Sequence, residues 1–186
     1  MVESDDEIER MARSRKGDPA AFEALIQKYQ QMIHALTYRM TGSLADCKDL
    51  AQETFVRAYR QWDSFQGDAK FSSWLYRIAV NACLDWRRRE SRRQQMLNDW
   101  AEGDACSSPS NGLAGNQDER IALVQAALMK LPEKQRAAIV LTVYGDHSHA
   151  EAAKSLGCTE ATVSWRVFSA RRKLKKLLSK PRDHHD

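Results

Sequence analysis

The chain has 186 residues, a formal net charge of +4 and 42% hydrophobic residues, with only eight glycines and four prolines. This composition supplies enough apolar surface for a packed core and excludes a fibrous or low-complexity protein. No apolar stretch approaches the roughly 20 residues that span a bilayer, so we expect no membrane insertion. The first residues are acidic where a secretory signal would be basic, which favours a cytoplasmic protein.

Helical signals follow one another through the first half of the chain. Asp18 is a favourable N-cap with Pro19 at the first helical position, and Gly42 ends the helix that they begin. A second helix follows, and after a turn at residues 63–68 a third helix runs into an arginine cluster at residues 87–93. Apolar and polar residues never alternate over a useful length, so we expect no sheet.

The last part of the chain has the spacing of a helix-turn-helix. Two helices are expected before this motif, at residues 121–129 and 132–144. Ser148 and Glu151 then form a capping box at the start of a short helix. Gly157 makes the turn, and Thr159 caps a longer helix that runs to about residue 178. A short helix, a glycine turn and a longer helix are typical of DNA-binding proteins.

Charge is distributed in blocks along the sequence. Residues 70–95 hold seven basic side chains against two acidic ones, and residues 165–182 hold eight basic side chains and no acidic one. Between them, residues 96–118 carry four acidic side chains and no basic one. Two basic helices on either side of an acidic segment indicate two contact points on a polyanion.

The acidic segment also marks a change in composition. It is rich in glycine, serine and asparagine, and such a stretch buries too little apolar area to offset the entropy of ordering it. We therefore predict an all-α protein with two small helical domains, at residues 1–95 and 118–186. A flexible acidic linker at residues 96–117 would join them.

The last helix is predicted to expose aromatic side chains. At about 100° per residue, Val163 and Val167 fall on the face that packs on the domain. Trp165, Phe168 and Arg172 fall on the opposite face, which is unusual for a solvated surface. This face suits a DNA major groove, although the basic residues would also simply make the helix soluble. The helix-turn-helix spacing favours DNA.

Four sequence motifs follow one another along the chain. They are DPAAFEALIQKY at 18–29, DLAQETFVRAYRQWDSF at 49–65, KFSSWLYRIAVNACLDWRRR at 70–89, and LPEKQRAAIVL with EAAKSLGCTEATVSWRVFSARRKL at 131–141 and 151–174. In this order they resemble bacterial RNA polymerase sigma factors of the extracytoplasmic-function (ECF) type, in the sigma-70 family. The resemblance implies a promoter-specificity subunit that binds core polymerase and opens promoter DNA, with no catalysis and no cofactor of its own.

The resemblance also implies which residues dock on the polymerase. The second motif is similar to the helix that binds a basic coiled coil of the β′ subunit. The resemblance implies contact with the β′ and β subunits of the core polymerase. The residues implied in this contact are Asp49, Leu50, Gln52, Glu53 and Val56. An equally simple interpretation of the apolar half of this helix is that it packs in the core. Such proteins commonly have an anti-sigma factor that covers the docking surfaces.

The third motif is similar to the segment that reads and melts the minus-ten element. The residues implied in this DNA contact are Phe65, Gln66, Asp68, Lys70, Arg77, Asn81, Arg87 and Arg88. A loop around residues 65–68 would hold a flipped base, with Asn81 on the adjoining helix. Capturing unstacked bases needs stacking surfaces and polar groups in a basic groove. We expect Trp74 to be a core residue instead.

The fourth motif is similar to the domain that reads the minus-thirty-five element. The residues implied in this contact are Thr159, Thr162, Ser164, Trp165, Arg166, Phe168, Ser169, Arg171, Arg172 and Lys173. The family usually has basic residues at positions 164 and 169, and often a small polar residue at position 165. Because this chain departs from that pattern, contact through Trp165 and Phe168 would favour thymine methyl groups or the DNA backbone.

Other functions fit the sequence less well. A free-standing helix-turn-helix regulator is the main alternative, but it needs neither the motif at residues 49–65 nor a second basic block. A deaminase signature, a phosphate-binding glycine loop and a nuclease-like carboxylate cluster are all missing, which disfavours a nucleic-acid enzyme. His147, His149 and Cys158 lie near one another in the sequence, but without a fourth ligand we expect no metal site.

Overall fold

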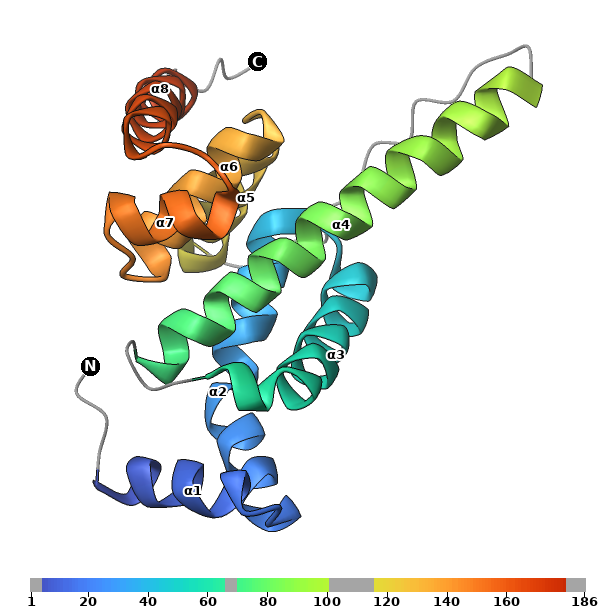
Figure 1. Ribbon diagram of the computed structural model, residues 1–186. Coiled ribbons are helices and arrows are strands. Elements are labelled where there is room, and N and C mark those ends of the chain that lie inside the picture. Colours follow the sequence, from blue (N-terminus) through green and yellow to red (C-terminus); the bar gives the residue numbers. More distant parts are fainter. Residues whose placement is uncertain (1–4, 66–69, 101–115, 180–186) are drawn as a thin grey trace.

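The computed structural model describes residues 5–65, 70–100 and 116–179 (Figure 1). Its helices are α1 (Asp5–Arg15), α2 (Pro19–Thr41), α3 (Leu44–Arg60), the 3-10 helix η1 (Trp62–Ser64), α4 (Phe71–Trp100), α5 (Asn116–Met129), α6 (Glu133–Ile139), the π-helix η2 (Val140–Tyr144), α7 (His149–Leu156) and α8 (Glu160–Leu178). These three ranges contain no strand, which confirms the expected all-α fold. Among them no helix is both long and apolar enough for a membrane span.

Local capping signals set the ends of α2. The Asp18 side chain accepts hydrogen bonds from the backbone N–H groups of Ala20 and Ala21, at 3.0 Å and 3.3 Å. Pro19 occupies the first turn, where its missing N–H costs nothing. At the other end Gly42 has φ +74°, a left-handed conformation that glycine adopts without strain. Both predicted ends of this helix are therefore confirmed.

The helix-turn-helix is formed by α7 and α8. Ser148 and Glu151 make a full capping box at the start of α7, and Gly157 closes the helix at φ +58°. The Thr159 hydroxyl accepts a hydrogen bond from the Thr162 N–H at 3.2 Å and begins α8. The apolar face of α8 is fully buried at Val163 and nearly so at Val167, as its helical spacing predicts.

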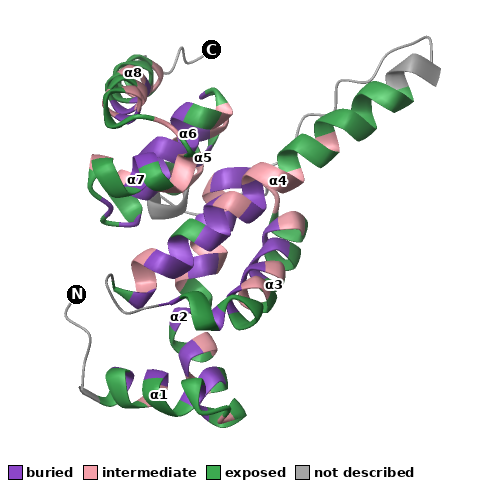
Figure 2. Cartoon of the chain, in the orientation of Figure 1, coloured by how far each residue is buried: buried purple, intermediate pink, exposed green. Residues whose placement is uncertain are grey.

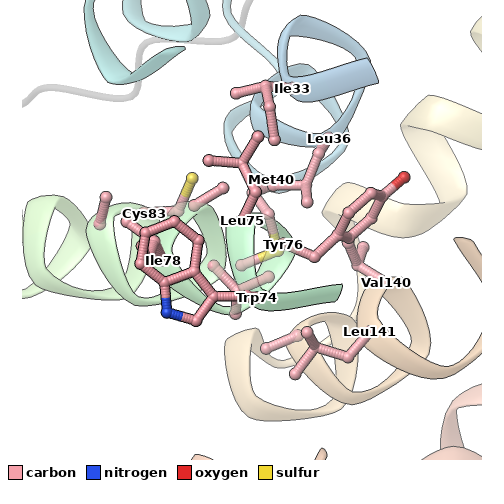
Figure 3. Close-up of a cluster of buried hydrophobic side chains, with 14 of the residues drawn as sticks. Ile33, Leu36, Met40, Trp74, Leu75, Tyr76, Ile78, Cys83, Val140 and Leu141 are labelled. Atoms are coloured by element: carbon pink, nitrogen blue, oxygen red, sulfur yellow. The ribbon is translucent and has the colours of Figure 1, made fainter. Parts of the chain in front are cut away.

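A hydrophobic core runs through both halves of the molecule. Figure 3 shows side chains of α2 and α4, such as Leu36 and Leu75, pointing toward one another, with Val140 and Leu141 of η2 beside them. All four are buried, and so is Trp74, which confirms its expected place in the core. The residues before and after the predicted linker therefore share one continuous core rather than standing apart.

Two features of the helical layout differ from the sequence prediction. Helix α4 continues through residues 96–100 and α5 begins at Asn116, although we expected linker over 96–117. Helix-favouring residues continue past position 93, and the next glycine along the chain comes only at position 103. The second half of α4 is largely exposed and projects from the body (Figures 1 and 2). The middle of the predicted linker, 101–115, lies outside the described residues.

Candidate nucleic-acid interface

Helix α4 presents a basic face with one amide. Lys70 immediately precedes the helix, and Arg77, Asn81 and Arg88 follow at intervals that place all four on one side. Lys70, Arg77 and Arg88 are exposed, whereas Asn81 is half-buried among them. Arg87 is also exposed, about a quarter of a turn around the helix. The sequence-predicted minus-ten residues on this helix are thus brought together.

Phe65 has a different place from the one predicted for it. Its side chain is 6% exposed, and its ring lies 5.2 Å from the Trp74 ring and 5.6 Å from the Phe71 ring, centroid to centroid. In this structure the Phe65 side chain packs the core and offers no face for stacking on a base, because its neighbours already cover it. Its backbone carbonyl accepts a hydrogen bond from the Arg15 guanidinium of α1. Gln66 and Asp68 lie outside the described residues.

The outer side of α3 borders a groove. Asp49, Gln52 and Val56 are exposed on this helix, and Gln52 and Val56 line a groove of about 710 Å³ between α2 and α3. Ile26 and Phe55 contribute apolar surface to the same groove. The remaining lining residues are Phe22, Gln30, His34, Lys48, Ala51, Tyr59 and Arg60.

Two residues predicted on this docking surface have structural roles instead. Leu50 is 1% exposed, so it faces the core and not the groove. The Glu53 carboxylate binds Arg57 at 2.6 Å and Arg89 at 3.4 Å, while Arg57 also binds Asp85 at 2.9 Å. Because Arg89 and Asp85 lie on α4, this network ties α3 to α4. Glu53 is predicted as a contact residue because of its charge. In the structure that charge is paired with Arg57 and Arg89.

Helix α8 exposes the aromatic stripe that its spacing predicts. Trp165 is 62% exposed and Phe168 is 65% exposed. Arg171, Arg172 and Lys173 are exposed further along the same helix. An aromatic stripe that continues into a run of cations can contact base edges and phosphates together.

Four polar residues of the motif are engaged within it. The Ser164 hydroxyl lies 2.8 Å from His149 Nδ1, and the Ser169 hydroxyl accepts a hydrogen bond from Gln135 at 3.3 Å. Arg166 Nη1 lies 3.4 Å from Cys158 Sγ. Thr162 bonds the Thr159 cap, with 2.8 Å between their hydroxyl oxygens. The contacts of His149 and Gln135 leave no pattern in the sequence, because they form only when α6, α7 and α8 pack together.

The histidines near Cys158 do not converge on a metal site. His147 Nδ1 lies 2.9 Å from the Gly145 carbonyl oxygen, and Nε2 lies 3.0 Å from that of Ser73. His149 is instead directed at Ser164. Over the described ranges, no three histidine, cysteine, aspartate or glutamate side chains come close enough together to hold a metal ion.

The basic face of α4 and the aromatic stripe of α8 define a helical protein with two separate surfaces suited to DNA. Residues 25–93 match the family described as Sigma-70 region 2, and residues 121–174 match Sigma-70, region 4. The chain is 34% identical over 177 residues to the ECF RNA polymerase sigma factor SigW of Bacillus subtilis (strain 168), which covers 91% of this chain and 95% of the relative. It therefore belongs to the ECF sigma factors of the sigma-70 family, subunits that bind RNA polymerase and give it promoter specificity.

Solved structures of similar proteins agree with this assignment. CnrH, solved in complex with the cytosolic domain of CnrY, is 28% identical and has a TM-score of 0.65, covering 94% of this chain and 97% of its own. The sigma factor RpoE of Bartonella quintana, solved with the anti-sigma factor NepR, is 27% identical with a TM-score of 0.67, covering 87% and 98%. Because similarity extends through both regions, a free-standing helix-turn-helix regulator is not favoured.

Proposed function

We propose that this sigma factor divides its work among three surfaces. The α2–α3 groove docks on core polymerase, the basic face of α4 holds the opened minus-ten element, and α8 binds the minus-thirty-five duplex. The observation that carries this proposal is the grouping of Lys70, Arg77, Asn81 and Arg88 on one face of α4. A single amide among three cations matches the need to read a base while holding the phosphates beside it.

The chemistry of the groove supports the docking assignment. Its apolar floor and the exposed Val56 suit the apolar face of a helix, as in other helix-in-groove complexes. The exposed carboxylate of Asp49 would favour a basic partner such as the β′ coiled coil. We assign contact to Asp49, Gln52 and Val56, with Leu50 and Glu53 holding the helix behind them. The same groove would be covered by an anti-sigma factor when the protein is held inactive.

In this proposal, the free energy of binding unpaired bases is enough to open the promoter. A hydrogen-bonded contact to a base edge contributes about 1–3 kcal/mol, so a few captured bases offset the unpairing of a short A·T-rich stretch. The protein then needs no catalytic group, because the polymerase core performs the chemistry. Its place of action would be the bacterial cytoplasm, where transcription occurs.

Asn81→Ala tests the minus-ten assignment. We expect permanganate reactivity of melted thymines to fall about tenfold, because one base-edge contact contributes about 1–3 kcal/mol. Binding to core polymerase, measured by gel filtration of the complex, would stay unchanged. Gln27→Ala, an exposed amide on α2, is the matched control. Unchanged permanganate reactivity in Asn81→Ala would remove this residue from the proposed site.

Val56→Arg tests the docking surface through its effect on polymerase binding. An arginine at position 56 would replace the apolar contact by a charged group that the partner's apolar face would bury, so we expect about a tenfold or greater loss of affinity for core polymerase. Gln31→Arg adds the same charge at an exposed position of α2 outside the groove and should bind normally. If both variants bind core polymerase equally well, the groove is not the docking site.

A further inference from the structure

The exposed stripe of α8 contains unusually little polar chemistry. Ala161, Trp165, Phe168 and Arg172 follow one another along its outer face, and all four are exposed. Two large aromatic side chains, each more than 60% exposed, thus occupy the middle of the helix face. Leaving this much aromatic surface in water is unfavourable unless a partner covers it.

The polar groups beside the stripe are already used. Ser164 is directed at His149, Ser169 accepts from Gln135, and Arg166 reaches the thiol of Cys158. The two serine hydroxyls are therefore engaged inside the domain, and Arg166 uses one of its five N–H donors there. Base edges facing this part of α8 would meet mostly aromatic carbon, apart from the indole N–H of Trp165.

Charge around the stripe indicates what covers it. After Glu160 in the first turn, α8 contains no further acidic residue, and cations occupy much of its second half. The cations are Arg166, Arg171, Arg172, Lys173, Lys175 and Lys176. A surface with an apolar centre and a cationic surround is complementary to a DNA major groove, whose walls are phosphates.

We propose that Trp165 and Phe168 read the C5-methyl groups of thymines in the minus-thirty-five element. The thymine methyl is the one apolar group that standard base pairs present in the major groove, and it is the group that an aromatic edge can distinguish. Arg172, one turn beyond Phe168, would hold a phosphate and carry little sequence information. This inference rests on the proposed function, because it assumes that α8 enters the upstream duplex.

The experiment compares duplexes with and without thymine methyl groups. Promoters are first selected from a random library with the full chain bound to core polymerase, and the best is then remade with deoxyuridine in place of each upstream thymidine. We expect about a fourfold loss of affinity for each contacted methyl group, the value of burying one such group. Replacing cytosine by 5-methylcytosine at an unmodified position gives a measure of nonspecific methyl effects.

Three variants identify the residues that read the methyl groups. Trp165→Ala and Phe168→Ala should each reduce the preference for the thymidine duplex over the deoxyuridine duplex by about fourfold, the value of the methyl group that each residue contacts, whereas Arg172→Ala should weaken binding of both duplexes and keep their ratio. Ile121→Ala removes a similarly exposed apolar side chain from α5 and is the matched control. Equal binding of both duplexes by the unaltered protein would overturn the inference.

Two further outcomes separate this inference from the proposed function. If Trp165→Ala loses affinity for core polymerase while its methyl discrimination is intact, the stripe binds protein and the inference is wrong. If no promoter is selected by the complex at all, the proposed function itself fails. If promoters are selected and transcribed but methyl groups make no difference, only the reading by Trp165 and Phe168 fails.

Discussion

At the scale of single residues, burial determines the chemistry of the thiols. Cys83 on α4 is 2% exposed, and burial raises the pKa of its thiol to about 12. Cys47 on α3 is 4% exposed, and burial also raises the pKa of its thiol. Cys158 is half-buried in the turn of the helix-turn-helix. Because only the thiolate is nucleophilic, the three residues should differ in reactivity.

Alkylation rates check this ordering. With a pKa near 12 in place of 9.0, the thiolate fraction of Cys83 at pH 8 is about a thousandfold lower than normal. We expect iodoacetamide to modify Cys158 within minutes and to leave Cys83 and Cys47 unmodified, as followed by peptide mass spectrometry. In 6 M guanidinium chloride, a convenient denaturing concentration, all three should react. Equal rates for Cys83 and Cys158 in the folded protein would contradict the burial described above.

At the scale of elements, capping groups determine where helices begin. Ser148 donates its backbone N–H and its hydroxyl to Glu151 Oε2, both at 2.8 Å, and its hydroxyl oxygen accepts the Glu151 N–H at 3.2 Å. These hydrogen bonds hold the pKa of Glu151 below its ordinary value of 4.5. A lowered pKa means that the carboxylate stabilises the fold above about pH 4.5. That contribution is lost as the pH falls through the lower, folded-state pKa.

Ser148→Ala should therefore destabilise the protein in a pH-dependent way. We expect the free energy of unfolding to fall by about 1 kcal/mol at pH 7, the usual cost of losing an N-cap. The cost should shrink as the pH falls below 4.5 and through the lower, folded-state pKa of Glu151, because the carboxylate then becomes protonated in both proteins. Ser155→Ala removes a hydroxyl near the end of α7 that bonds the Glu151 carbonyl, so it should be nearly neutral. Urea unfolding at several pH values measures both variants, and a constant cost for Ser148→Ala across them would refute the linkage.

Because capping interactions are local in the sequence, they were the features that the sequence could predict. The caps at Asp18, Ser148 and Thr159 involve residues within three positions of one another, so their patterns are visible in the sequence. Helix α1 was missed because a distant contact anchors it: the buried Glu7 carboxylate binds Lys28 at 2.5 Å and also the Tyr29 hydroxyl. The stripe of α8 was predictable by helical spacing. The burial of Phe65 and Leu50 depends on tertiary packing, which spacing alone does not reveal.

At the scale of the whole molecule, the two regions are joined by polar contacts to backbone carbonyls. Gln125 donates to Tyr38 O at 2.7 Å, and the buried Arg136 donates to Met40 O at 2.8 Å. Burial lowers the pKa of Arg136, which has no carboxylate partner among the ion pairs of the described ranges. Carbonyl acceptors are present at every residue, so these contacts leave no sequence pattern, and the packing of the two regions could not be predicted.

This packing brings the second region against the proposed minus-ten surface. Asp146 Oδ2 lies 3.5 Å from Lys70 Nζ. His147 and Glu151 line a cavity of about 310 Å³ together with Arg77. Acidic side chains therefore lie near cations that we assign to DNA. If promoter DNA needs these cations free, binding must first separate the two regions, and the cost of separation reduces the apparent affinity.

His147→Ala should lower that cost. The substitution removes the contact of Nε2 with the Ser73 carbonyl, 3.0 Å away on α4, and opens a small cavity at the domain contact. We expect a larger radius of gyration in small-angle X-ray scattering and a two- to tenfold higher affinity of the polymerase complex for promoter DNA, since each tenfold corresponds to about 1.4 kcal/mol. His149→Ala is the matched control for the scattering measurement, because its imidazole bonds Ser164 within the second region. An unchanged radius of gyration and promoter affinity in His147→Ala would show that this contact does not restrain the two regions.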